Sequence, residues 1–204
     1  MASDDQYNTI EQPGEGIFRD KGSRFIGYAY PIESEGEIKD ILADLRANHP
    51  KARHFCWAYR LGPDKNVFRL NDDGEPGGSA GRPILNTILS AGLTNVFVVV
   101  VRYFGGTLLG VPGLINAYKT ATAEALNNCS IVERTVNDLY NLSFSYTDTN
   151  SVMKIIKEEH LKILEQRFDT ESELSIQIPQ SRAAGILSRL NDIRGLVSTY
   201  LKTN

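Results

Sequence analysis

Cysteine is scarce in this sequence of 204 residues, which contains only Cys56 and Cys129. Two thiols are too few for a disulfide scaffold or for a cysteine-rich zinc site. Long apolar runs are also lacking, since the longest covers residues 96–101 and a membrane-spanning helix needs roughly 20 residues. The first residues, Met-Ala-Ser-Asp-Asp, are polar and do not resemble a signal peptide. These absences predict a soluble protein of the reducing cytoplasm that does not associate with membranes.

Positive charge is not in excess either. The chain has 22 Lys and Arg residues against 25 Asp and Glu residues, for a net charge of −3. This balance argues against a protein that coats nucleic acid with bulk positive charge, so any site for an anion must be local. Hydrophobic residues make up 41% of the chain and charged residues 23%, which is typical of a folded globular protein. The length fits one large domain or two domains of about 100 residues each.

The first part of the chain predicts a sheet with helices packed on it. Residues 1–15 are polar and predict a loose amino-terminal arm. Ser34 and Glu37 form a capping-box pattern before an amphipathic segment that Pro50 ends, which predicts the first helix. The remaining elements are strands on both sides of a turn at 21–23, a hairpin of 55–61 and 67–70, a buried central strand at 96–101, and helices at 83–91 and 114–127. The buried side of the helix at 114–127 is expected to consist of Leu114, Ile115, Tyr118, Ala121, Ala125 and Leu126.

The pattern of the chain changes after Arg134. Alternating apolar residues predict a half-buried strand at 140–146, and further helical and alternating segments follow it. Their order is β-α-β-β-α-β, the ferredoxin-like split motif. The sequence therefore predicts an α+β protein with a boundary near Val136, which gives a first domain over residues 16–135 and a second domain over residues 136–204.

Two glycine-rich segments are the most distinctive feature of the sequence. The first glycine loop (residues 71–81) and the second glycine loop (residues 102–113) each lead into a predicted helix. Glycines let backbone N–H groups converge, and a helix N-terminus adds unpaired donors, so such loops can hold a phosphate group. Arginines can add charge-assisted hydrogen bonds, and a tyrosine ring can stack on a base. The candidate ligand-binding residues are Asp72, Asp73, Gly74, Glu75, Gly81, Arg82, Arg102, Tyr103, Gly105, Gly106, Gly110 and His54.

Neither loop matches a standard catalytic or phosphate-binding motif. Gly105 and Gly110 have the spacing of the outer glycines in a Walker A loop, but Val111 and Pro112 replace its Lys-Ser/Thr pair. Residues 77–81 fit G-x-S-x-G, yet that motif needs a buried strand immediately before it, and acidic residues stand there instead. A P-loop hydrolase and a serine hydrolase are therefore both disfavoured.

The acidic residues of the first glycine loop leave two interpretations open. Asp72, Asp73 and Glu75 can work with His54 in a hydrolase or phosphoryl-transfer enzyme. Alternatively, these carboxylates cap turns, and the two arginines of the loops pair with them. No metal and no cofactor is expected, and a hydrogen-bonded, partly buried role is favoured for His54.

The residues of both glycine loops resemble the signature of a known family. Residues 72–85 read Asp-Asp-Gly-Glu-Pro-Gly-Gly-Ser-Ala-Gly-Arg-Pro-Ile-Leu, and residues 99–106 read Val-Val-Val-Arg-Tyr-Phe-Gly-Gly. Together with residues 24–26 and 54–60, they resemble the YigZ/IMPACT family over about residues 16–130. The resemblance implies a first domain like the second domain of ribosomal protein S-five. It also implies a small second domain related to domain V of elongation factor G.

The same resemblance implies a setting in translation. Eukaryotic members regulate translation initiation through the general amino-acid control pathway. They carry an additional RWD domain that has no counterpart in this sequence, so that partner-binding role is not expected to transfer directly. Three positions depart from the family pattern, namely Gly77, Ser79 and Pro112. The proline stiffens the second glycine loop and removes one backbone donor from it.

The favoured hypothesis is a translation-related regulator that binds RNA or another phosphate-bearing polyanion through its glycine-rich loops. Its expected partners are RNA, the ribosome or translation factors. The alternatives are the hydrolase or phosphoryl-transfer enzyme described above and a protein-interaction regulator that uses the exposed sheet of the second domain. The two glycine loops are expected to meet in space, because the central strand should deliver Arg102 to the sheet edge where the helix near Pro83 begins.

Overall fold

The computed structural model describes residues 5–168 and 171–203. The chain forms two compact units. The N-terminal unit covers Tyr7–Arg134, and the C-terminal unit begins at Thr135 and also includes Asp5 and Gln6. The division thus lies within two residues of the boundary that the sequence predicts near Val136.

The N-terminal unit contains a five-stranded antiparallel sheet. Its strand order is β2-β3-β6-β4-β5. The strands are β2 (Gly14–Asp20), β3 (Ser23–Pro31), β6 (Val96–Tyr103), β4 (His54–Leu61) and β5 (Val67–Asn71). Both predicted strand pairs, β2 with β3 and β4 with β5, are confirmed. The apolar strand β6 occupies the centre, as its composition predicts, and residues 96–101 are all fully buried.

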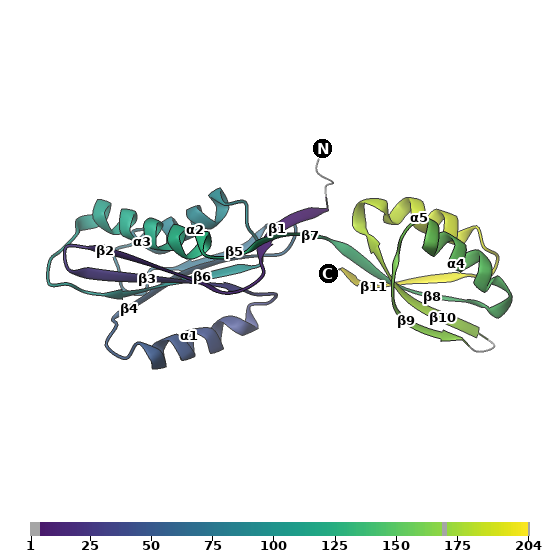
Figure 1. The fold of residues 1–204 in the computed structure, drawn as a ribbon, viewed down its shortest axis with the longest axis horizontal. Helices are drawn as coiled ribbons and strands as arrows, with labels where there is room; N and C mark the ends of the chain where they lie inside the picture. Colours follow the sequence, from purple (N-terminus) through teal and green to yellow (C-terminus); the bar gives the residue numbers. More distant parts are fainter. Residues whose placement is uncertain (1–4, 169–170, 204) are drawn as a thin grey trace. The chain divides into compact units, whose positions relative to one another are not determined.

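Helices cover both faces of this sheet. Figure 1 shows α2 (Gly81–Ser90) and α3 (Gly110–Asn127) on one face and α1 (Gly36–Asn48) on the other. Successive side chains of a strand point to opposite faces, so β6 divides its valines between two cores. Val98 and Val100 pack with α2 and α3, whereas Val99 and Val101 pack with α1. A continuous apolar strand is stable here because neither face meets water.

One end of the sheet gathers the segments of chemical interest, and we call it the loop end. Strand β6 ends there with Arg102 opposite His54 and Tyr103 opposite Arg24. Both glycine loops lie there, and α2 and α3 begin from them. The second loop lies against the β2–β3 turn so closely that a Cβ on Gly105 would stand 1.9 Å from the carbonyl carbon of Gly22. Only glycine allows this approach of two backbones.

The loose amino-terminal arm predicted for residues 1–15 needs correction. Strand β1 (Gln6–Ile10) pairs with β7 (Ile131–Thr135), and β2 already begins at Gly14, while residues 1–4 lie outside the described part. Ile10 is fully buried, because it packs in the core under α2 and α3. Local polarity concealed this strand, since its partner is far away in the sequence. Ile115 is a second correction: it is 40% exposed although its spacing predicts a buried position.

The C-terminal unit has the predicted β-α-β-β-α-β order. Its elements are β8 (Asn137–Ser145), α4 (Thr149–Glu158), β9 (Lys162–Phe168), β10 (Glu171–Pro179), α5 (Ala183–Asn191) and β11 (Val197–Thr203), with short 3-10 turns at Tyr146–Asp148 and Gln180–Arg182. The strand order β11-β8-β10-β9 is ferredoxin-like. Both helices pack on one face of this sheet (Figure 1). The predicted α+β class is therefore confirmed.

Candidate functional site

The first glycine loop is organised around the carboxylate of Asp72. Its Oδ1 accepts hydrogen bonds from the backbone N–H groups of Ala80 at 3.0 Å and Gly81 at 2.8 Å, and its Oδ2 accepts one from Gly78 at 2.9 Å. The amides of this loop and of the α2 N-terminus therefore converge on an anion, as the sequence predicts. That anion is the protein's own carboxylate. This corrects the expectation that the first loop offers these donors, including that of Gly81, to a phosphate.

Asp73 ties the same loop to strand β4. Its Oδ2 accepts a hydrogen bond from the N–H of Phe55 at 2.7 Å, and Arg46 approaches its Oδ1 at 3.4 Å. The backbone carbonyl of Asp73 lies 2.9 Å from Nδ1 of His54. A carbonyl only accepts, so Nδ1 of His54 carries the proton. The hydrogen-bonded, partly buried histidine that the sequence favoured is confirmed, and Gly74 turns beside its ring with φ +86°.

Glu75 forms a buried ion pair with Arg102. Nη1 of Arg102 donates to Oε1 of Glu75 at 2.5 Å, and the two side chains are only 6% and 3% exposed. Tyr118 donates to the same carboxylate oxygen at 2.7 Å. Burial, together with Cys56 and Glu75, raises the pKa of Tyr118, so its hydroxyl keeps the proton that it donates.

This ion pair corrects the expected role of Arg102 as a ligand open to solvent. A buried carboxylate is costly unless a cation neutralises it, and Arg102 does so for Glu75. The sequence left open that the loop arginines pair with the loop acids. This arrangement holds for Arg102, whereas Arg82 has no acidic partner at ion-pair distance among the described residues. Nε of Arg102 is also buried and has no hydrogen-bond partner among the described residues.

Cys56 and Tyr118 are members of this buried network that sequence reasoning did not single out. The sulfur of Cys56 lies 3.0 Å from the carbonyl oxygen of Asp72 and 3.3 Å from the hydroxyl of Tyr118. Burial raises the pKa of the Cys56 thiol, so it remains protonated and donates to one of these two acceptors. Helical spacing correctly buried Tyr118 but gave no information on what its hydroxyl meets. The signal available in the sequence was a single tyrosine among the alanines on the side of this helix that faces the core.

The second glycine loop contains no comparable internal anion within the described part of the chain. The N–H of Gly105 donates to the hydroxyl of Ser23 at 3.1 Å. Gly106 and Gly110 adopt φ values of +88° and +71°, and both are exposed. The N-cap residue of α3 is Leu109, whose side chain cannot accept a hydrogen bond, and no other side chain of the described residues accepts one from the first turn of this helix. Its first turn therefore offers backbone donors that the protein does not satisfy with a side chain.

The aromatic residues next to this loop differ in accessibility. The hydroxyl of Tyr103 lies 2.8 Å from Nδ1 of His49, and the guanidinium of Arg24 lies 4.5 Å from the centre of its ring. The ring is half-buried against the core under α1. This corrects the expectation that Tyr103 stacks on a base. Its neighbour Phe104 is 51% exposed.

The predicted site residues thus differ in whether the protein itself engages them. The structure joins His54, Asp72, Asp73, Glu75 and Arg102 in one hydrogen-bonded set, which confirms that the two glycine loops meet at the Glu75–Arg102 pair. The residues that remain exposed are Gly74, Arg82, Gly105, Gly106 and Gly110, whereas Gly81 is buried and Tyr103 is half-buried. No group of three or more metal-ligating side chains occurs in residues 5–168 and 171–203. No helix within these ranges is long and apolar enough to cross a membrane.

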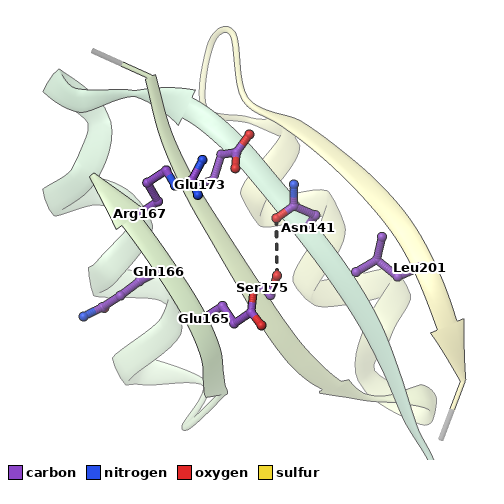
Figure 2. A pocket seen from close by; sticks show the side chains of 7 residues that line it. All are labelled: Asn141, Glu165, Gln166, Arg167, Glu173, Ser175 and Leu201. Carbon is purple, nitrogen blue, oxygen red and sulfur yellow. Dashed lines mark hydrogen bonds between the residues drawn. The ribbon is translucent and has the colours of Figure 1, made fainter. Parts of the chain in front are cut away.

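The C-terminal unit has a separate hollow on the sheet face that its helices leave open. Its volume is about 610 Å³. The lining residues, shown in Figure 2, are Asn141, Glu165, Gln166, Arg167, Glu173, Ser175 and Leu201. Ser175 donates to Asn141 at 3.4 Å across strands β10 and β8. Two carboxylates and one guanidinium give this surface a mixed charge.

Fold and site together define a two-unit α+β protein whose glycine-rich signature is folded around internal ion pairs. The family model of the Impact N-terminal domain matches residues 21–126. The chain belongs to the IMPACT family.

Relatives of similar length support this assignment. The chain is 32% identical to the IMPACT family member YvyE of Bacillus subtilis, over 85% of this chain and 80% of that one. It is 37% identical to the "IMPACT family member in pol 5'region" of Thermus thermophilus, over 84% of this chain and 93% of the relative. A solved structure described as a hypothetical protein is 28% identical, with a TM-score of 0.71, and covers 97% of this chain and 98% of its own. Both units of the fold therefore recur in a solved structure.

Proposed function

We propose that this protein is a translation-related regulator that binds RNA or another phosphate-bearing polyanion at the loop end of its N-terminal unit. The observation that carries the proposal is an imbalance of charge. Three acidic side chains at this end, Asp72, Asp73 and Glu75, are each engaged by internal donors. Their charge is therefore largely compensated before any ligand arrives.

The cations of the same end are not compensated in this way. Lys21, Arg53 and Arg82 are exposed, and none of them has an acidic partner at ion-pair distance among the described residues. A chain with a net charge of −3 thus still has a locally basic region. A local excess of cations attracts phosphate groups even where the total charge is negative.

The second glycine loop supplies the backbone part of the proposed site. Residues 104–108 of this loop are exposed, and no side chain among the described residues caps the N-terminus of α3. Phosphates bind such helix N-termini because unpaired N–H groups and the helix dipole both favour negative charge. The family resemblance is the reason for placing the ligand in translation, with RNA, the ribosome or a translation factor as the partner.

The test is RNA binding measured by fluorescence anisotropy over a range of salt concentrations. Lys21→Ala and Arg82→Ala should each weaken binding and reduce the slope against the logarithm of salt concentration by about 0.7, the value for one phosphate contact on a single strand. Lys154→Ala, which removes an exposed lysine of α4 in the C-terminal unit, is the matched control and should change neither quantity. Binding that does not depend on salt, or no binding to RNA or ribosomal particles, would contradict the proposal.

The hollow on the C-terminal sheet favours protein interaction as a second candidate function. Its Glu165, Arg167 and Glu173 present both signs of charge, which suits a protein partner better than a phosphate backbone. Glu173→Lys reverses one charge there. Loss of RNA binding in this variant, with the loop-end variants unaffected, would place the ligand on the C-terminal unit instead.

A further inference from the structure

We propose that Phe104 is the platform on which an unpaired base of a single-stranded nucleic acid stacks at the loop end, with Arg102 as the residue that positions its ring. The inference rests on the proposed function and deepens it, because it identifies which form of RNA the site takes. Phe104 takes the stacking role that the sequence assigned to Tyr103, because the ring and the hydroxyl of Tyr103 are both engaged within the protein.

The first observation is the exposure of Phe104 where the chain leaves strand β6. It is 51% exposed, although an exposed phenylalanine ring forgoes the free energy of burial. Residues 105–108, which follow it directly, are exposed as well. A flat apolar ring beside an exposed, glycine-rich backbone matches a nucleotide, which presents a base next to a phosphate.

The second observation is the fixed support of this ring. The guanidinium carbon of Arg102 lies 5.6 Å from the centre of the Phe104 ring and 5.3 Å from that of the buried Phe25. Arg102 itself is held by Glu75 at 2.5 Å. A cation over an aromatic ring is attractive, so the buried ion pair restrains the exposed ring. A ring that is already ordered loses little conformational entropy when a base stacks on it.

The third observation is the position of a cation for the adjoining phosphate. Gly105 lies against the backbone of Gly22, and Lys21, the residue before Gly22, is exposed. Its ammonium group can therefore reach a phosphate beside the second glycine loop. The bases of a duplex are stacked on each other and cannot lie on a protein ring, so the site selects single strands.

The test compares Phe104→Ala with Phe68→Ala, a matched control. Phe68 lies on the edge strand β5 and is 50% exposed. Its strand partner is Arg60 of β4, which lies away from the loop end. Binding of a short poly-uridine oligonucleotide should weaken roughly 5- to 150-fold in Phe104→Ala, the range for one stacked base. It should remain within about twofold of wild type in Phe68→Ala. The salt slope should not change in either variant, because neither residue is charged.

A second variant tests stacking directly. Phe104→Trp should retain affinity, and its added fluorescence should be quenched by the single strand and not by an RNA duplex of the same length. If Phe104→Ala binds poly-uridine as wild type does while Lys21→Ala weakens binding, stacking is wrong and the proposed function stands. If the wild-type protein binds neither single-stranded nor duplex RNA, both fail. Equal quenching by single strand and duplex would also overturn the stacking inference.

Discussion

The two glycine loops of the N-terminal unit resemble each other in composition and differ in what occupies them. Three amides of the first loop surround the carboxylate of Asp72, so an anion is already bound there. The second loop is exposed at residues 104–108, and in the described part of the chain no side chain caps the start of α3. A loop rich in glycine thus creates converging donors, and the nearby sequence decides whether the protein or a ligand satisfies them. A tethered carboxylate has the advantage because it loses no translational freedom on binding.

The ion pair that joins the two loops gives the largest expected effect. Arg102→Met leaves Glu75 buried without its cation, and we expect the free energy of unfolding to fall by about 3–5 kcal/mol. Urea denaturation followed by circular dichroism measures this loss. The double variant Glu75→Gln with Arg102→Met should recover part of it, since no unpaired charge remains. A loss below about 1 kcal/mol would mean that the pair contributes no more than a surface salt bridge.

Removing the carboxylate of Asp72 should leave the first glycine loop without an internal anion, which is the condition of the second glycine loop. Asp72→Ala deprives the N–H groups of Gly78, Ala80 and Gly81 of their acceptor, and we expect stability to fall by about 2–3 kcal/mol. Sulfate should then raise the melting temperature of the variant more than that of the wild type, since the ion can occupy the vacated donors. Chloride at equal ionic strength is the control. An equal effect of sulfate on both proteins, which is its general influence on stability, would refute an anion site.

The backbone of the second loop allows a comparison of two adjacent glycines. Gly106→Ala meets no atom within 4 Å but keeps a φ of +88°, so it should cost about 1–2 kcal/mol. Gly105→Ala should cost more, because its Cβ would collide with the backbone of Gly22 at 1.9 Å. Thermal unfolding of both variants gives the order. The reverse order would show that the second loop does not rest on the β2–β3 turn.

The smallest effect concerns the histidine that anchors the strand end before the second loop. Burial and the charge of Arg24 lower the pKa of His49, whose nitrogens lie 2.9 Å from the hydroxyl of Tyr28 and 2.8 Å from that of Tyr103. The folded state therefore binds a proton less readily than the unfolded chain does. The stabilisation that neutral His49 contributes to the folded state is therefore complete above its ordinary pKa of 6.5, and it is lost as the pH falls below that value. His49→Gln should flatten that part of the stability profile between pH values of about 5 and 7. An unchanged profile would assign the pH dependence of stability to groups other than His49.

Local patterns in the sequence were sufficient for most of the elements. The central strand β6 follows from its continuous apolar composition. The β-α-β-β-α-β order follows from periodicity, since burial repeats every two residues in strands and every three or four in helices, and the two hairpins follow from short strand patterns on both sides of turn residues. The same reasoning failed for β1, which is stabilised by pairing with β7 and by burial of Ile10. It also failed for Ile115, which has helical core spacing and is nevertheless exposed. For β1 the strand partner is distant in the sequence, so no local pattern could reveal it.

The sequence by itself determined the family, the α+β class and the two glycine loops, because each of these depends on residue types at short spacing. Only the tertiary structure decided which polar groups meet. Glu75 and Arg102 stand 27 positions apart, and nothing in the local pattern of either residue shows that burial will force them to pair. In the structure Arg102 is buried with Glu75, the carboxylate of Asp72 occupies the amides of the first glycine loop, and Phe104 remains exposed. The physical reason is that a buried charge must find its partner in three dimensions, whereas hydrophobic periodicity is written along the chain.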